Sequence, residues 1–163
     1  MPEQKIIPNL WFDTQAEEAA AYYIDVLGSG RVLNVLNYPE GSGEQTGSVL
    51  TVDFEAGGMR FIGINGGPQF RFTEAVSLQI DCADQAEVDR FWDRFISDGG
   101  AESRCGWLTD KYGLSWQVVP RGMERLFGDP DPGRAQRAVQ AMMQMRKLDV
   151  AALRTAADAV PVS

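Results

Sequence analysis

An internal repeat is the feature that most constrains the fold of this 163-residue chain. The stretch LWFDTQAEEAAAYYIDVLGSG, residues 10–30, aligns with LQIDCADQAEVDRFWDRFISDGG, residues 78–100. Each copy has a leucine and an aspartate in a short apolar run, then Gln-Ala-Glu, a helical stripe with aromatic residues, and a closing glycine. Self-similarity of this length indicates that one supersecondary unit occurs twice. The second half is therefore predicted to be a shortened copy of the first.

Apolar periodicity in the first half predicts a strand, a helix and then three strands, in the order βαβββ. The four strands are expected at residues 5–12, 31–38, 48–55 and 59–65. The last two form a hairpin about residues 56–58. Asp13 or Thr14 is expected to cap the helix, and Gly28 and Gly30 are expected to end it.

The second half shows the same pattern over a shorter length. Its strands are expected at residues 75–82, 101–105, 106–110 and 114–119. Its helix carries apolar residues at helical spacing, namely Val88, Phe91, Trp92, Phe95 and Ile96. We interpret this stripe as core packing against a sheet and not as a cofactor site. In the last strand, Ser115, Gln117 and Val119 share one face, which is polar at its centre.

A helical extension is predicted after Pro120, where the repeat ends. Asp131 is a suitable cap with Pro132 at the first helical position, and Asp149 suits a last short helix. The helix between them is rich in methionine and must be covered, either by its own sheet or by a second subunit. We predict three segments, which are a first module at 1–66, a second module at 67–120 and the extension at 121–163, together in one compact domain.

Composition excludes several classes of function. Fifteen basic against twenty-three acidic residues give a net charge of -8, which disfavours nucleic acids and anionic membranes. No apolar run is long enough for a signal peptide or a membrane span, so a cytoplasmic location is expected. Cys82 and Cys105 are expected to be buried free thiols. The chain has no histidine, which excludes Ser-His-Asp and Cys-His chemistry and leaves carboxylate, tyrosine, lysine or thiol for proton transfer.

Two tandem βαβββ modules resemble the vicinal oxygen chelate superfamily, the fold of glyoxalase I, extradiol dioxygenases and bleomycin-resistance proteins. The stretches LWFDTQAEEAAAYY, NGGPQFRFTEAVS, GWLTDKYGLSWQVVP and DPDPGRAQRAVQAMMQMRKLDVAAL are similar to its PhnB-like branch, once labelled demethylubiquinone methyltransferases. The resemblance spans residues 5 to about 155. It implies an α+β fold in which the two modules form a curled mixed sheet around a cleft, and it favours a homodimer.

The resemblance also implies a metal site, because enzymes of this superfamily hold a divalent cation on the first and fourth strands of each module. The corresponding positions here are Ile7 or Asn9, Gly63, Ala75 or Ser77, and Gln117. None supplies a carboxylate or an imidazole, and a slip of one residue brings no better ligand. A neutral amide such as Gln117 can orient a ligand but adds no charge to hold a dication. We therefore expect neither a metal nor another cofactor.

Two hypotheses of function follow from the sequence. The first is a metal-independent protein that binds an unidentified small molecule in the cleft, through Asn9, Trp11, Asn65, Ser77, Gln79, Trp107 and Gln117. The alternative is an enzyme, either a metal-assisted lyase, isomerase or dioxygenase, with Glu74, Asp81 or Tyr112 as acid or base, or a methyltransferase. Methyl transfer is the least favoured, because the glycines of VLGSGRV end a helix, whereas an S-adenosylmethionine site needs them to open one.

Overall fold

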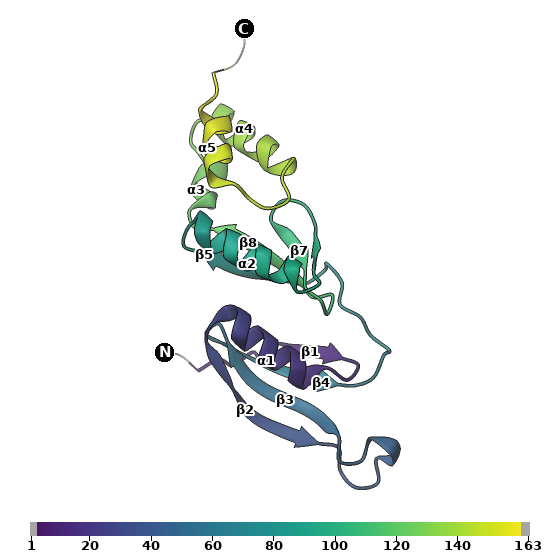
Figure 1. The fold of residues 1–163 in the computed structure, drawn as a ribbon. Coiled ribbons are helices and arrows are strands. Elements are labelled where there is room, and N and C mark those ends of the chain that lie inside the picture. Colours follow the sequence, from purple (N-terminus) through teal and green to yellow (C-terminus); the bar gives the residue numbers. More distant parts are fainter. Residues whose placement is uncertain (1–2, 161–163) are drawn as a thin grey trace. The chain divides into compact units, whose positions relative to one another are not determined.

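A computed structural model describes residues 3–160 (Figure 1). They form two compact units whose boundary lies between Phe72 and Thr73. Each unit contains one of the predicted modules, and the C-terminal helices belong to the second unit. Within residues 3–160, no helix is both long and apolar enough to span a membrane.

The first unit has the predicted βαβββ order. Its elements are β1 (Asn9–Phe12), α1 (Ala16–Leu27), β2 (Gly30–Asn37), a short 3₁₀ helix (Gly43–Gln45), β3 (Val49–Ala56) and β4 (Met59–Asn65). The strands form one mixed sheet in the order β1-β4-β3-β2. The first and last strands, β1 and β4, are parallel, and the other pairs are antiparallel.

The second unit repeats this topology in a shorter form. Its sheet module consists of β5 (Ser77–Cys82), α2 (Gln85–Ser97), β6 (Ala101–Glu102), β7 (Trp107–Thr109) and β8 (Ser115–Pro120). The sheet order is β5-β8-β7-β6, again with the first and last strands parallel. The internal repeat of the sequence is thus a repeat of strand topology, and each copy forms its own four-stranded mixed sheet.

In each unit the helix covers one face of the sheet, and aromatic residues fill the layer between them. Phe54 of β3 stacks on Phe61 of β4 with ring centroids 5.5 Å apart, and Tyr23 of α1 packs on Phe54. In the second unit, Phe95 of α2 lies 5.0 Å from Trp116 of β8, and both are buried. The interpretation of the aromatic stripe as core packing is confirmed.

The two ends of α1 differ from each other in how well the sequence predicts them. Gly28 ends the helix in the left-handed conformation, with φ of 73°, as expected. The prediction that Asp13 or Thr14 caps the start is wrong. Gln15 occupies the cap position without a side-chain bond, and the Asn65 side chain accepts the Ala16 N–H instead.

The C-terminal extension contains α3 (Met123–Phe127), α4 (Pro132–Met143) and α5 (Val150–Asp158). The predicted caps of the two longer helices are confirmed. The Asp131 carboxylate accepts the Gly133 N–H, and the Asp149 carboxylate accepts the Ala152 N–H, both at 2.9 Å. Each cap supplies an acceptor for an N–H group that has no partner within its helix.

The extension is anchored to its own module by the loop between α4 and α5. The backbone N–H of Cys105 donates to the carbonyl of Met145 at 2.9 Å, and that of Gly106 donates to Arg146 at 2.8 Å. Gly106 has φ of 83°, and a Cβ at this position would press on the side chain of Leu148. A glycine is therefore required where the loop approaches the sheet.

The Gln85 side chain completes this anchor from the start of α2. Its amide N–H donates to the Leu148 carbonyl at 2.9 Å, and its amide oxygen accepts the Val150 N–H at 2.8 Å. The Leu148 side chain is 2% exposed. The extension thus packs in cis on the second module, which answers a question that the sequence leaves open.

We predict that Leu148→Ala lowers the free energy of unfolding by about 2 to 5 kcal/mol, because it opens a cavity where the extension meets the module. The matched control is Met143→Ala, which removes a half-exposed side chain of α4 and is expected to cost less than about 1 kcal/mol. Chemical denaturation of both variants measures the difference. Equal losses of unfolding free energy in the two variants would show that burial of Leu148 does not specially stabilise the contact between the extension and the module.

Candidate functional site

The seven predicted binding residues fall in both units. Asn9, Trp11 and Asn65 lie in the first unit, and the other four, Ser77, Gln79, Trp107 and Gln117, lie in the second. The geometry of each group is described within its own unit.

The four residues of the second unit share the helix-free face of its sheet. The register places Gln79, Gln117 and Trp107 in one row across β5, β8 and β7. The neighbouring row on the same face carries three hydroxyl groups, those of Ser77, Ser115 and Thr109. The alternate residues, among them Trp116 and Leu108, are buried on the opposite face, where α2 packs. The predicted polar centre on one face of the last strand is confirmed.

The Gln117 amide is held in a defined orientation. Its Nε2 donates to the hydroxyl of Ser77 at 2.9 Å, across the pair of parallel strands. Its Oε1 accepts no hydrogen bond from any side chain or backbone group of residues 3–160. A primary amide has two N–H donors and one acceptor oxygen, so one donor and the acceptor remain available beside Ser77.

Ser115 adds a second polar group to the same face. Its side chain is 1% exposed, and its hydroxyl has no hydrogen-bond partner in the described part of the chain. A buried hydroxyl without a partner costs about 1 to 3 kcal/mol of stability. Such groups are uncommon in folded proteins and point to a functional role or to a missing partner.

Of the acid and base candidates of the enzyme hypothesis, only Asp81 lies on this face, two residues after Gln79. The Asp81 carboxylate is exposed and accepts a hydrogen bond from Arg121 at 2.9 Å. Tyr112 lies in a turn organised by Asp110, whose Oδ1 accepts the N–H of Tyr112 at 2.8 Å. Glu74 is an exposed residue of the turn that precedes β5. The structure does not bring the three residues together around Gln117.

Cys82 is also unsuited to act as a nucleophile. Its side chain is fully buried, and this burial raises the pKa of the thiol to about 12. The thiol therefore stays protonated at neutral pH, and a protonated thiol is a poor nucleophile. Both cysteines are free, but only Cys82 is buried, whereas Cys105 is half-buried, so the expectation of two buried thiols is only partly correct.

In the first unit, Trp11 holds the segment that follows β4. The indole Nε1 donates to the Gly67 carbonyl at 2.9 Å, and its ring meets Phe70 edge-on with centroids 4.9 Å apart. A Cβ at Gly66 would overlap this ring, so only glycine fits there. Among the described residues, the Asn9 side chain bonds only to the nearby Ile7 carbonyl, to which its Nδ2 donates at 3.0 Å. The indole N–H of Trp11 is thus already used in a hydrogen bond within the chain.

Asn65 lies on the other face of the first sheet, toward α1. Its side chain is buried, its Oδ1 accepts the Ala16 N–H at 2.8 Å, and its Nδ2 donates to the Val49 carbonyl at 3.1 Å. Gly63 has the same orientation, since a Cβ there would contact the Ala16 side chain. The expectation that Gly63 corresponds to a metal-ligand position, on the same face as Asn9, is therefore wrong by one residue. Asn65 is likewise not brought together with Asn9 and Trp11.

The residues at the positions that the superfamily uses for metal do not fit a divalent cation. On the helix-free faces, the paired first and last strands present Asn9, Trp11, Ile62, Ile64, Ser77, Gln79, Asp81, Ser115, Gln117 and Val119. Among the residues that the structure describes, no three His, Cys, Asp or Glu side chains are grouped so that they could hold a metal ion. Asp81 is the single carboxylate among these residues and is paired with Arg121, and the neutral amides and hydroxyls supply no further anionic ligand.

The first unit also contains a pocket of about 400 Å³ at the start of α1. Asn65 and Tyr38 border it, and the Tyr38 hydroxyl donates to the Asn65 carbonyl at 2.5 Å. The carboxylates of Asp13 and Glu17 lie at its rim. Of the predicted binding residues only Asn65 lines this pocket, because much of the lining comes from the segment between β2 and β3.

Comparison with known proteins gives the family. Residues 4–119 match the 3-demethylubiquinone-9 3-methyltransferase family. The chain belongs to this PhnB-like family. No curated protein matches this chain. The match ends before α3, so the C-terminal extension lies beyond it.

Solved structures give the same result for the fold. The PhnB protein from Bacillus cereus, which has the same family description, is 31% identical over 72% of this chain and 99% of its own, with a TM-score of 0.64. The protein PA1353 from Pseudomonas aeruginosa is 20% identical over 72% of this chain and 98% of its own, with a TM-score of 0.60. The fosfomycin resistance protein FosX from Listeria monocytogenes is 15% identical over 77% of this chain and 97% of its own, with a TM-score of 0.53. The last two similarities concern the fold alone.

We predict that Asn65→Ala lowers the free energy of unfolding by about 1 to 3 kcal/mol, because it leaves the Ala16 N–H and the Val49 carbonyl without partners. Asn9→Ala is the control, since Asn9 is exposed and bonds only within its own strand region. We expect the control to change stability by less than about 0.5 kcal/mol. Urea denaturation measures both, and an Asn65→Ala protein as stable as Asn9→Ala would contradict the capping role.

Proposed function

We propose that this PhnB-like protein binds a small, neutral, polar molecule on the helix-free face of the second sheet, centred on Gln117 and without a divalent metal. The observation that carries the proposal is the Gln117 amide, which Ser77 holds in place while its oxygen stays available. The Ser115 hydroxyl two residues away is 1% exposed and so closed to a ligand, which leaves the free amide N–H and the oxygen of Gln117 as the accessible groups. Together they suit a ligand that has both donor and acceptor groups.

The other residues of this face are consistent with a neutral ligand. Trp107 lies in the same row as Gln117 and offers a partly exposed aromatic ring for contact with a planar group. The charge of Asp81 is compensated by Arg121. Gln79, at the other end of the row, adds a second amide. We also propose that the sheet curls around a cleft on its helix-free face, so that it surrounds the bound ligand.

Several observations favour binding over methyl transfer, despite the family description. The connections from β1 to α1 and from β5 to α2, residues 13–15 and 83–84, contain no glycine. Gly28 ends α1, and Gly30 begins β2. The glycine-rich turn that usually places a nucleotide-like cofactor at a helix N-terminus therefore has no counterpart in these connections.

The donor set also separates this chain from a protein of similar fold that has been solved with a bound metal. FosX from Listeria monocytogenes has been solved in complex with Mn(II) and sulfate. The helix-free faces here present amides, hydroxyls, apolar side chains and one carboxylate, Asp81, which is paired with Arg121, along the paired strands. This difference supports metal-independent binding.

We expect Gln117→Leu to weaken ligand binding by about tenfold to a hundredfold, because the ligand loses its polar partners at this position. A thermal-shift screen of neutral polar metabolites against the unaltered protein supplies the compound, which is then titrated by calorimetry. The titration is repeated with EDTA, and we expect the same dissociation constant because no metal takes part. Elemental analysis checks that the purified protein contains no stoichiometric divalent metal.

Ser77→Ala is the matched control for this experiment. It removes the internal bond to Gln117 but keeps the amide, so affinity should fall less than in Gln117→Leu. If Gln117 only ties β5 to β8, both variants will melt earlier and will bind the compound with unchanged affinity. That outcome, or binding abolished by EDTA, would refute the proposal.

The same proposal includes a homodimer, which an exposed edge strand supports. Within the first sheet, β2 is an edge strand, and its apolar residues Val32, Leu33, Val35 and Leu36 are between 38% and 55% exposed. An apolar edge strand is prone to associate with another chain. Val139 and Met143 of α4 are also exposed, although the extension itself is anchored in cis.

Light scattering is expected to give about twice the chain mass of 18.0 kDa. The double variant Val32→Lys with Leu36→Lys should be a folded monomer, because two charges on this strand oppose association. The control Met59→Lys, at an exposed position in the β3–β4 hairpin, should remain dimeric. A monomeric unaltered protein would contradict the dimer but not the ligand site.

A further inference from the structure

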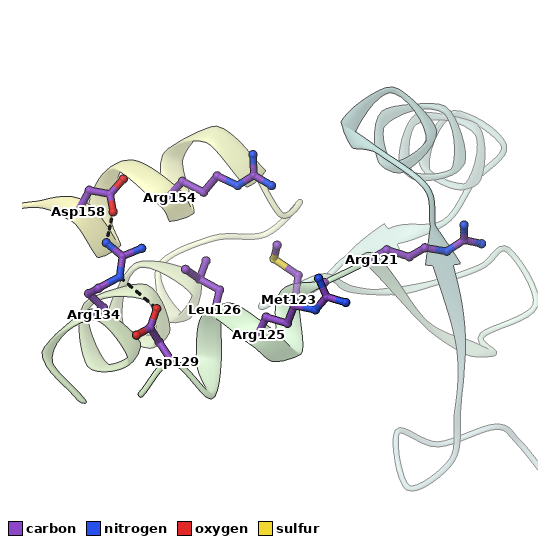
Figure 2. A pocket seen from close by; sticks show the side chains of 9 residues that line it. Arg121, Met123, Arg125, Leu126, Asp129, Arg134, Arg154 and Asp158 are labelled. Carbon is purple, nitrogen blue, oxygen red and sulfur yellow. Dashed lines mark hydrogen bonds and ion pairs between the residues drawn. The ribbon is translucent and has the colours of Figure 1, made fainter. Parts of the chain in front are cut away.

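The C-terminal extension contains a second pocket, of about 420 Å³, where α3, α4 and α5 meet (Figure 2). All of its lining residues lie at position 121 or beyond. The pocket is therefore outside the part of the chain that matches the family, residues 4–119, and shares no lining residue with the row of Gln117. Its volume falls in the range of small-molecule sites, about 300 to 1,000 Å³.

Basic side chains outnumber acidic ones in the lining of the pocket, although the whole chain is acidic. Four arginines reach it, namely Arg121, Arg125, Arg134 and Arg154. Two carboxylates, those of Asp129 and Asp158, also line it, which leaves a formal excess of two positive charges. In a chain with a net charge of -8, this local excess reverses the sign expected of an average surface patch.

Both carboxylates form ion pairs with one of the four arginines, Arg134. Arg134 Nε lies 3.0 Å from the Asp129 carboxylate, and Arg134 also pairs with Asp158 of α5. The pKa of Asp129 is lowered, first by the backbone N–H of Asp131 and then by Arg134, so this carboxylate stays ionised. These bonds fix Arg134 between α5 and the loop before α4, and Figure 2 shows the guanidinium between its two partners.

Arg125 and Arg154 differ from Arg134 because neither pairs with a carboxylate in the described part of the chain. Arg125 projects from α3 and Arg154 from α5, so two separate helices bring them to one pocket (Figure 2). Arg121 is less available, since it bonds to Asp81 at 2.9 Å. The pocket thus offers two unpaired guanidinium groups.

Apolar side chains lie between these two arginines. Met123 is 4% exposed and Leu126 is half-buried, and both line the pocket from α3. In Figure 2 they occupy the space between Arg154 and Arg125. A ligand that contacts all four side chains has an anionic group for the guanidiniums and an apolar part for Met123 and Leu126.

We infer that this pocket binds a small organic phosphate, whose dianionic group is held by Arg125 and Arg154 and whose apolar part rests on Met123 and Leu126. Guanidinium groups bind phosphate oxygens through paired, charge-assisted hydrogen bonds. A phosphate monoester carries close to two negative charges at neutral pH, which matches the two unpaired arginines. A carboxylate carries one charge and is the weaker fit.

Calorimetric titration with phenyl phosphate tests this inference on the full chain. We expect saturable binding, tighter than that of inorganic phosphate because the ring adds apolar contact, and tighter than that of benzoate because benzoate has one charge. Arg125→Gln and Arg154→Gln should each weaken phenyl phosphate binding by about tenfold to a hundredfold. The control Arg104→Gln removes an exposed arginine of the same unit, outside the pocket, and should leave the affinity unchanged.

Three results would overturn the inference. They are the absence of saturable phenyl phosphate binding, an equal loss of affinity in Arg104→Gln, and binding of inorganic phosphate as tight as that of phenyl phosphate. Circular dichroism checks that the variants fold. Methyl NMR on the unaltered protein gives a second measurement, since phenyl phosphate should shift the resonances of Met123 and Leu126, and unshifted resonances would also refute the site.

Discussion

The parallel pairing of the first strand of each module with its last strand is the interaction on which the rest of the structure depends. β1 pairs with β4 and β5 pairs with β8, so the two strands that are farthest apart in each module become neighbours. A parallel pair needs a connection that crosses one face of the sheet, and α1 and α2 supply it. The helix therefore buries one face, and the other is left for side chains such as Gln117.

The repeat and the alternation of residue types made most of this topology predictable. In β8, Trp116 and Val118 alternate with Ser115 and Gln117, so the assignment of faces was unambiguous. In β4 the sequence MRFIGIN is apolar on both faces, and periodicity gave no such signal. The face of Gly63 was consequently assigned to the wrong side, since a shift of one residue exchanges the two faces of a strand.

Contacts between residues far apart in the sequence could not be predicted in the same way. A helix cap is normally sought next to the helix, as Asp131 and Asp149 show, but the cap of α1 comes from Asn65, at the end of β4. The bond from Gln117 to Ser77 depends on the register of β5 and β8, which no local pattern contains. The sequence predicts Asn65 as a binding residue but gives no sign of its role in holding α1, because a polar residue at a strand end has the same local pattern in both roles.

The extension gives the second unit two environments of different chemistry. The helix-free face of the sheet has amides and hydroxyls, with its nearby carboxylate Asp81 compensated by Arg121, and so favours uncharged ligands. The pocket among α3, α4 and α5 has more arginine than aspartate, and so favours anions. Arg121 follows β8 directly and lines that pocket while bonding to Asp81 of β5. A single side chain therefore borders the pocket and holds the carboxylate at the edge of the sheet.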